Sequence, residues 1–490
     1  MIKLLVLIPA VAGAAAFFIG QDPIRRLLLV FTAIVHAVLS IASWIAPPPP
    51  SLNGWLAEDA LGRLFLTLTS LLFLASSFYA VAYLRGERGQ PHSDFEEGFL
   101  FSNAREASFT GCLLLFLAAM TVVTLSQHLG LLWVSVEATT LASAPLIYFH
   151  RHHRSLEATW KYLLICSVGI ALALLGIFFL AVAASSPGTA NVSLVLKDLL
   201  SAAPHLNPLW LKAAFVLMLV GYGTKMGLAP FHTWLPDAHS EAPSVVSALL
   251  SGALLNCAFL GILRIHQVCR ASGLADFSEQ LLLVLGLLSM AAAAIFITGQ
   301  VDYKRMLAYS SVEHMGILAV GVGLGGAGLF GAMLHVVNHS LTKAMLFMVA
   351  GNLLAVYRTK TTKDVSGALS VLPVSGLLWI LGFLAITGSP PFGPFLSELA
   401  ILKAALDQGR AFVAIAYLIF LAIIMAGMAT PALAMAQGTP SDTVVVPAGR
   451  GFALSAVPTI LGASILLMGV YVPPVLTRTL LEAARLLGHI

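Results

Sequence analysis

Gly227-Leu-Ala-Pro-Phe231 and Gly388-Ser-Pro-Pro-Phe392 each interrupt an apolar run that is long enough to span a membrane. Proline removes a backbone donor and clashes with the preceding helical turn, so both segments predict a broken helix, at Pro230 and Pro391. A helix broken at membrane depth is tolerated only where protein or a water-filled cavity covers the backbone. Paired interruptions therefore point to an internal repeat with a transport site between its halves.

The rest of the chain has the composition of a protein that crosses a membrane many times. Its 490 residues are 59% hydrophobic and 10% charged, with a mean hydropathy of +0.93, whereas a soluble chain carries about a quarter charged residues. A bilayer core about 30 Å thick needs roughly 20 apolar residues per helix. Apolar runs predict an all-α polytopic fold of about fourteen spans, near residues 2–20, 24–46, 60–84, 107–126, 128–149, 159–184, 209–229, 241–268, 278–298, 306–325, 327–357, 371–407, 410–436 and 451–473.

A second pair of similar segments supports the internal repeat. Ser135-Val-Glu137 and Ser311-Val-Glu313 each lie one to two predicted spans ahead of a broken helix. We infer two five-helix repeats, spans 4–8 and 9–13, which have opposite topology because five is odd. The predicted divisions are spans 1–3, the first repeat, the second repeat, and the last span with a short interfacial helix, at residues 1–106, 107–270, 271–436 and 437–490.

Basic residues are distributed unevenly between the predicted loops. The loops after even-numbered spans hold three, Lys197, Arg270 and Arg410. Those after odd-numbered spans hold thirteen: Arg25, Arg26, Arg85, Arg88, Arg105, Arg151, Arg154, Lys304, Arg305, Arg358, Lys360, Lys363 and Arg450. Because basic loops stay in the cytoplasm, both termini are predicted to face outward.

Two charged residues fall inside apolar runs, where a charge costs about 2.5–3.5 kcal/mol. Glu137 lies in the fifth predicted span and Lys225 just before the first break. A pair about 4 Å apart at an effective dielectric of about 20 is worth about 4 kcal/mol, and moving one charge through 100 mV costs about 2.3 kcal/mol. Forming and breaking such a pair is therefore strong enough to drive a proton. The alternative is an ion pair that only fixes packing.

His335, His339 and Lys343 recur every four residues, so they share one helical face. Histidine titrates near neutrality, and this stripe predicts a hydrated proton path. A single histidine on an apolar helix would more often be a core residue. His-x-x-x-His spacing can also bind zinc, but no Glu or Cys completes this set, so we expect no metal.

One further charged residue belongs to the predicted proton path, and three more are candidates for supporting roles. Glu398, after the second break, is predicted to hand protons outward, whereas Lys403 either contributes or snorkels at a helix end. Lys161 either tunes Glu137 or marks the cytoplasmic boundary. Glu313 and His314 are adjacent, so we expect them to point to different faces, one functional and one structural.

No cofactor motif is present in the sequence. The four cysteines, Cys112, Cys166, Cys257 and Cys269, show no Cys-x-x-Cys spacing, and no glycine-rich phosphate loop follows a strand. We therefore expect no cofactor in this chain and expect any redox chemistry to take place in a partner.

Residues 223–239, Gly-Thr-Lys-Met-Gly-Leu-Ala-Pro-Phe-His-Thr-Trp-Leu-Pro-Asp-Ala-His, and residues 304–316 resemble the antiporter-like subunits of respiratory complex I. That family also includes multisubunit cation/proton antiporters and the membrane arms of group 4 nickel–iron hydrogenases. Within it, residues 128–140 and 156–174 are most similar to component F of hydrogenase 4.

The resemblance implies fourteen core helices, two inverted five-helix repeats and broken helices seven and twelve. It places Glu137 and Lys225 on the family's charge pair and Glu398 on its terminal residue. The three α-helical positions His335, His339 and Lys343 fall on its channel residues. Asn256 departs from the family pattern, because many relatives carry Lys or His in this span and asparagine cannot titrate. Proton transfer at Asn256 must therefore run through water or be absent.

The family implies a proton-translocating subunit of a hydrogenase-type or complex I-type oxidoreductase in a bacterial or archaeal inner membrane. Its redox energy would come from partner subunits that carry iron–sulfur, nickel–iron or quinone sites, and the chain itself would not catalyse redox chemistry. Two alternatives remain open: a subunit of a multisubunit sodium/proton antiporter, and an energy-coupling partner in inorganic-carbon uptake.

Overall fold

The computed structural model describes residues 1–87, 92–93, 98, 100–185, 193–440 and 451–489. Within these residues, eleven helices are long and apolar enough to cross a membrane, or up to twelve if a bent C-terminal pair forms one span. The eleven are α2 (Asp22–Ile45), α3 (Ala60–Gly86), α4 (Glu106–Leu125), α5 (Leu129–Ile147), α6 (His153–Ala184), α8 (Pro208–Met226), the continuous segment of α10 (Ser244–Leu249), η2 (Leu250–Leu254) and α11 (Leu255–Ala271), α12 (Ala275–Ile297), α13 (Tyr303–Leu324), α14 (Ala327–Tyr357) and α18 (Ala411–Ala436).

The predicted polytopic helical membrane protein is confirmed, and the count of about fourteen spans stays a prediction. The apolar helices α1 (Ile2–Phe18) and α16 (Pro373–Ile386) are shorter than the eleven. The run predicted as one span at residues 371–407 is divided into α16 and α17 (Gly393–Asp407). The bent pair consists of α19 (Gly451–Val470) and α20 (Pro474–Leu487), which meet at 75°.

Short elements connect these helices. Two-residue strands β1 (His92–Ser93) and β2 (Leu100–Phe101) pair antiparallel, and the remaining helices are α7 (Leu196–Ala202), η1 (Ala203–His205), α9 (Trp234–Glu241), η3 (Thr362–Asp364) and α15 (Ala368–Val371). Of the basic residues used to predict orientation, Arg88 and Arg450 lie outside the described residues.

A helix ends at each predicted break. Helix α8 stops at Met226, and Gly227 leaves it in the left-handed region at φ 86°. Helix α16 stops at Ile386, and α17 begins seven residues later. Met226 and Ile386 each precede by four residues a proline, Pro230 or Pro390, which has no N–H to give to a helical carbonyl. The break in each case therefore frees a carbonyl oxygen.

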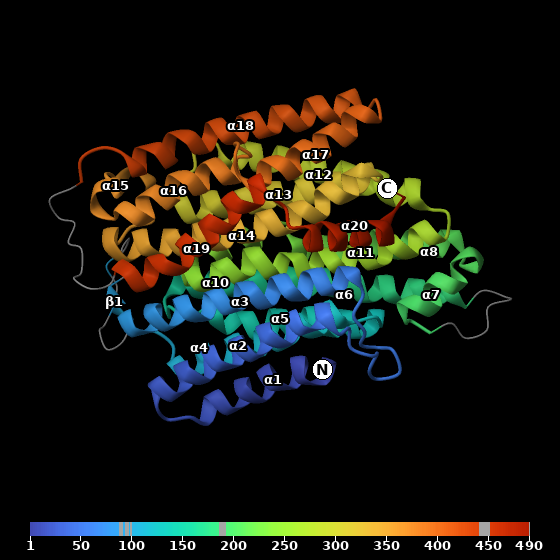
Figure 1. Cartoon of the computed structure of the whole chain (residues 1–490), viewed down its shortest axis with the longest axis horizontal. Helices are drawn as coiled ribbons and strands as arrows, with labels where there is room; N and C mark the ends of the chain where they lie inside the picture. Colours follow the sequence, from blue (N-terminus) through green and yellow to red (C-terminus); the bar gives the residue numbers. More distant parts are fainter. Residues whose placement is uncertain (88–91, 94–97, 99, 186–192, 441–450, 490) are drawn as a thin grey trace.

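The helices differ sharply in how far the protein covers them. The most apolar window of the α10–α11 segment is 100% buried and that of α13 is 94% buried, whereas that of α18 is only 28% buried. Figure 1 shows α1 and α2 at one edge of the bundle and α18 at the opposite edge. Arg264 of α11, Glu313 of α13 and Lys343 of α14 are accordingly buried.

Two helix pairs meet through glycine. A Cβ atom on Gly221 of α8 would lie 2.6 Å from the carbonyl oxygen of Gly169 in α6. A Cβ atom on Gly286 of α12 would lie 2.8 Å from the carbonyl oxygen of Gly316 in α13. Small residues let helix backbones approach closely in membrane proteins, so both pairs are packed backbone against backbone.

The predicted short C-terminal helix is present as α20. Its apolar face, which includes Leu480, Ala484 and Leu487, is buried against the bundle, and Gln267 of α11 donates a 3.2 Å hydrogen bond to the Leu486 carbonyl. Both termini lie in the right-hand part of Figure 1. The side of the membrane that they face stays a prediction.

Candidate functional site

Lys225 is fully buried at the end of α8 and connects to Glu137 through a hydroxyl group. The Lys225 ammonium donates to Thr140 Oγ1 at 2.8 Å and to the Tyr162 hydroxyl at 2.6 Å. Thr140 in turn donates to Glu137 at 3.2 Å, and Ser167 donates to the other Glu137 oxygen at 2.8 Å. Among the described residues the predicted charge pair is therefore bridged by Thr140 and forms no direct ion pair.

Lys161 does not reach Glu137. Its ammonium, at the start of α6, lies 2.6 Å from Glu157 and 3.0 Å from Asp237 of α9, and its side chain is 46% exposed. Lys161 therefore makes no contact with Glu137 among the described residues, and its place at the cytoplasmic boundary stays a prediction.

Asn256 lies between the two halves of the chain. Its amide donates to Ser340 Oγ of α14 at 2.7 Å and to the Gly252 carbonyl at 2.8 Å. Its buried Oδ1 has no hydrogen-bond partner among the described residues. The preceding turn, η2, is π-helical, a distortion that is frequent at functional sites.

The predicted stripe on α14 is completely buried. Lys343 donates to the Leu307 carbonyl at 2.6 Å and to Ser310 Oγ. Neither ring nitrogen of His339 has a hydrogen-bond partner among the described residues, although its ring centroid lies 5.2 Å from that of His314. His335, by contrast, has partners on both ring nitrogens.

Glu313 and His314, which the sequence predicts to point to different faces, both lie in one buried cluster with His335. His314 Nδ1 lies 2.8 Å from His335 Nε2, and Glu313 Oε2 lies 4.0 Å from His314 Nε2. Because α13 is enclosed by other helices, these adjacent residues both face protein. That one of them is functional and the other structural stays a prediction.

Glu398 reaches the same cluster from α17. Its carboxylate passes so close to Gly388 that a Cβ atom there would lie 1.9 Å from Oε2. Its buried Oε1 has no partner within the described part of the chain. Lys403, on the same helix, is 71% exposed and pairs at 2.5 Å with Asp407, so it lies apart from the buried cluster.

Donor atoms of His314, His335 and Glu398 all lie within 4.8 Å of one another. Two imidazoles and a carboxylate are a donor set that zinc accepts. This group contains only His335 of the predicted His-x-x-x-His pair, and its other two members come from α13 and α17. In the structure the two facing nitrogens of the histidines contact each other instead.

A second group of charges lies at the α9 end of the bundle. Glu241 accepts a 2.7 Å hydrogen bond from Lys360, and Lys304 donates to the Ala242 carbonyl at 2.6 Å. Burial raises the pKa of Glu241, but the Lys360 charge and hydrogen bond outweigh burial and hold the pKa below its usual value. These residues line a cavity of about 110 Å³.

Several residues that contact Glu137, Lys225 or His335 were not predicted from the sequence. Thr140, Tyr162, Ser167 and Ser397 gave no signal, because a lone hydroxyl in an apolar run is common. His239 lies in the stretch that carried the family resemblance, and it is fully buried against Phe347 with a ring-centroid distance of 4.9 Å.

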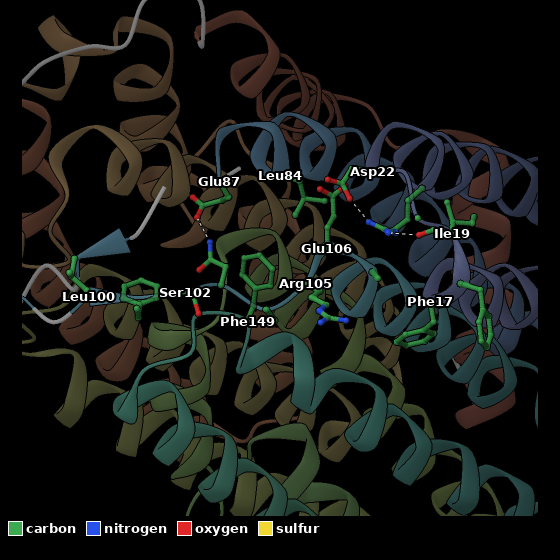
Figure 2. A pocket seen from close by; sticks show the side chains of 17 residues that line it. Phe17, Ile19, Asp22, Leu84, Glu87, Leu100, Ser102, Arg105, Glu106 and Phe149 are labelled. Atoms are coloured by element: carbon green, nitrogen blue, oxygen red, sulfur yellow. Dashed lines mark hydrogen bonds and ion pairs between the residues drawn. The ribbon is translucent and has the colours of Figure 1, made fainter. Parts of the chain in front are cut away.

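Another hollow lies away from these residues. It measures about 970 Å³ and lies among α1, α3 and α4 (Figure 2), where Phe17, Leu84, Glu106 and Phe149 line it. Arg26 holds Glu106 through two hydrogen bonds of 2.7 Å. None of the predicted path residues lines this hollow.

Comparison with known proteins agrees with this geometry. A family model described as NADH:quinone oxidoreductase/Mrp antiporter, TM, matches residues 126–425. The hydrogenase-4 component F homolog of Methylacidiphilum infernorum (isolate V4) is 38% identical over 349 residues, which are 71% of this chain and 72% of that relative. The resemblance inferred from the sequence is confirmed.

Solved structures share the fold over the whole chain. A chain of the membrane-bound sulfane sulfur reductase, an archaeal respiratory membrane complex, gives a TM-score of 0.87 at 20% identity, covering 100% of this chain and 98% of that one. A chain of the Mrp complex from Dietzia sp. DQ12-45-1b gives 0.85 at 20% identity, covering 99% and 97%. The chain therefore belongs to the NADH:quinone oxidoreductase/Mrp antiporter family of membrane proteins.

Proposed function

We propose that this chain is the proton-translocating membrane subunit of a hydrogenase-type or complex I-type oxidoreductase. The observation that carries the proposal is the buried lysine Lys225, which is joined to the carboxylate of Glu137 through a hydroxyl that can both accept and donate a proton. A purely structural ion pair would need direct contact to offset the loss of hydration.

The proposed path crosses the bundle in one direction. Protons pass from Glu137 and Lys225 through water beside Asn256, whose amide has a donor and an acceptor with which to order it. They continue along Lys343, His339 and His335 on α14, and leave through Glu398 at the second break. Lys161 and Lys403, which the structure places in exposed ion pairs, have no part in this path.

The two helix breaks also support the finer topology. We propose fourteen spans, with residues 107–270 and 271–436 as inverted repeats, residues 1–106 preceding them and residues 437–490 following. Both termini would face the outside. A cysteine introduced at Arg151 should then react with a membrane-impermeant reagent only from the cytoplasmic side, and one at Lys197 only from outside. The opposite pattern would reject the orientation.

The energy source is proposed to lie in partner subunits. The M. infernorum relative is named as a component of hydrogenase 4, and we propose that this chain likewise contains no redox cofactor and couples to one in a neighbouring subunit. A sodium/proton antiporter subunit is the second candidate, since the family model and one matching fold include Mrp antiporters.

The test uses the assembled complex in proteoliposomes. Glu137→Gln and Lys225→Met should each abolish proton uptake while the complex still assembles. Replacing sodium with potassium in the medium separates the two candidates, because only an antiporter would lose its activity. Normal proton uptake by either variant would reject the proposed function.

A further inference from the structure

Two buried histidines lie in a row of four polar contacts near the second helix break. Nε2 of His314 lies 3.0 Å from the Ile386 carbonyl oxygen, and Nδ1 of His314 lies 2.8 Å from Nε2 of His335. Nδ1 of His335 lies 2.9 Å from Ser397 Oγ, which lies 2.9 Å from the Pro394 carbonyl oxygen. The two histidines and the serine are fully buried, so water does not compete for these contacts.

The row contains one contact more than its side chains have hydrogens. Both ends are carbonyl oxygens, which can only accept. Two neutral imidazoles supply one N–H each and the serine supplies one O–H, which makes three hydrogens for four contacts. In the neutral state one contact therefore brings two lone pairs together. One additional proton supplies the missing hydrogen and completes all four bonds.

We propose that His314 and His335 share one additional proton and so form a proton-binding site of their own. The site gives His314 a defined role that the proposed path does not assign to it. The proposal rests on the proposed function, because the path delivers protons to His335 along α14.

Acidic side chains and a lysine lie around the histidine pair. A carboxyl oxygen of Glu398 lies within 4.8 Å of donor atoms on both histidines, and Glu313 Oε2 lies 4.0 Å from His314 Nε2. Lys343 is the lysine nearest to Glu313 in the electrostatics of the cluster. Protons can therefore be exchanged between the histidine pair and several titratable neighbours.

Two other titratable side chains surround the pair. His339 of α14 faces His314 with 5.2 Å between ring centroids. Tyr417 of α18 lies near both acidic side chains, and its hydroxyl has no hydrogen-bond partner among the described residues.

The ends of the row lie on the two halves of the broken helix. Ile386 is the last residue of α16, and its carbonyl is free because Pro390, four residues on, has no N–H. Ser397 and Pro394 belong to α17. A proton on the histidine pair therefore completes a set of hydrogen bonds that ties α16 to α17 through α13 and α14.

The decisive variant is His314→Gln in the assembled complex. The glutamine amide can donate to the Ile386 carbonyl and accept from His335, but it cannot hold an extra proton. We expect proton uptake to fall by about 10²-fold. The broad infrared absorption of a shared proton, identified by its shift on labelling histidine with ¹⁵N, should disappear. His36→Gln is the matched control, since His36 is also buried with partners on both ring nitrogens, Ser70 and Thr121.

A purely structural role for His314 predicts normal proton uptake by His314→Gln, and that result would overturn the proposal. Infrared titration of the unmodified complex tests it even if the variant fails to assemble, because absence of the shared-proton band at every pH also overturns it. If His314→Gln is normal while Glu137→Gln is blocked, only this inference fails. If both are normal, the proposed function fails as well.

Discussion

Lys225 of α8 donates a 2.8 Å hydrogen bond to the hydroxyl of Thr140 on α5. The same hydroxyl donates to Glu137, so in the part of the chain that the structure describes it links the lysine to the carboxylate. Tyr162 occupies the other side of the ammonium, with its ring centroid 4.4 Å away.

Thr140→Val should therefore interrupt proton transfer between Lys225 and Glu137. Valine has nearly the same shape as threonine but lacks the hydroxyl, and we expect proton uptake to fall by about tenfold or more, because a positioned proton carrier contributes at least that much. Thr140→Ser keeps the hydroxyl and should retain most of the rate. Equal rates for the two variants in proteoliposomes would show that the hydroxyl does not carry the proton.

Asn256→Leu should slow proton uptake by removing the amide that orders water between the two halves. An apolar side chain would dry the gap, and unpaired charges in a dry interior cost several kcal/mol. The matched control is Asn352→Leu, because Asn352 is also buried and donates to Ser375 at 3.1 Å. Both variants should lower stability, and only Asn256→Leu should lower the uptake rate per assembled complex.

Gly388→Ala should displace the Glu398 carboxylate. The added Cβ would clash with Glu398 Oε2, and Gly388 also has a φ of 65°, which strains any other residue. Gly409 has a similar φ of 68° with open space around it, so Gly409→Ala measures the backbone strain alone, about 1–2 kcal/mol. Gly388→Ala should be less stable than this control in thermal unfolding and should also lose proton uptake.

The ion pair between Asp59 and Arg264 should make stability depend on acid pH. Arg264 is fully buried in α11 and donates to both carboxylate oxygens of Asp59, the N-cap residue of α3. Burial raises the pKa of Asp59, but the charge and hydrogen bonds of Arg264 outweigh burial and hold the pKa below its ordinary 3.8. The stabilisation is therefore complete above about pH 4 and is lost as the pH falls through the lowered pKa.

Asp59→Ala should lower the free energy of unfolding by about 3 kcal/mol at neutral pH, since it leaves a buried charge without a partner. Asp407→Ala removes an exposed ion pair with Lys403 and should cost at most about 1 kcal/mol. Melting curves in detergent between pH 6 and pH 3 should converge for Asp59→Ala and the unmodified protein. Parallel curves would contradict the assigned pair.

The spans and helix ends could be predicted because apolar length and proline act locally. The buried stripe on α14 followed from a repeat of four, which is also local. The sequence could not predict that Thr140 lies between Lys225 and Glu137. A hydroxyl or a carboxylate can occupy any face of a helix, so the residue type alone does not show which neighbour it contacts. The meeting of His314 with Glu398 depends on how α13, α14 and α17 pack, and no spacing along one helix encodes that contact.

The glycine contacts between α6 and α8, and between α12 and α13, limit how this protein can move during turnover. At Gly221 and Gly286 the neighbouring backbones touch without an intervening side chain, so neither pair can slide or rock without opening a void along its length. A larger side chain at either glycine would push the two backbones apart. For the proposed proton path, this close packing favours rotation of hydroxyls and movement of lysine side chains over movement of these four helices.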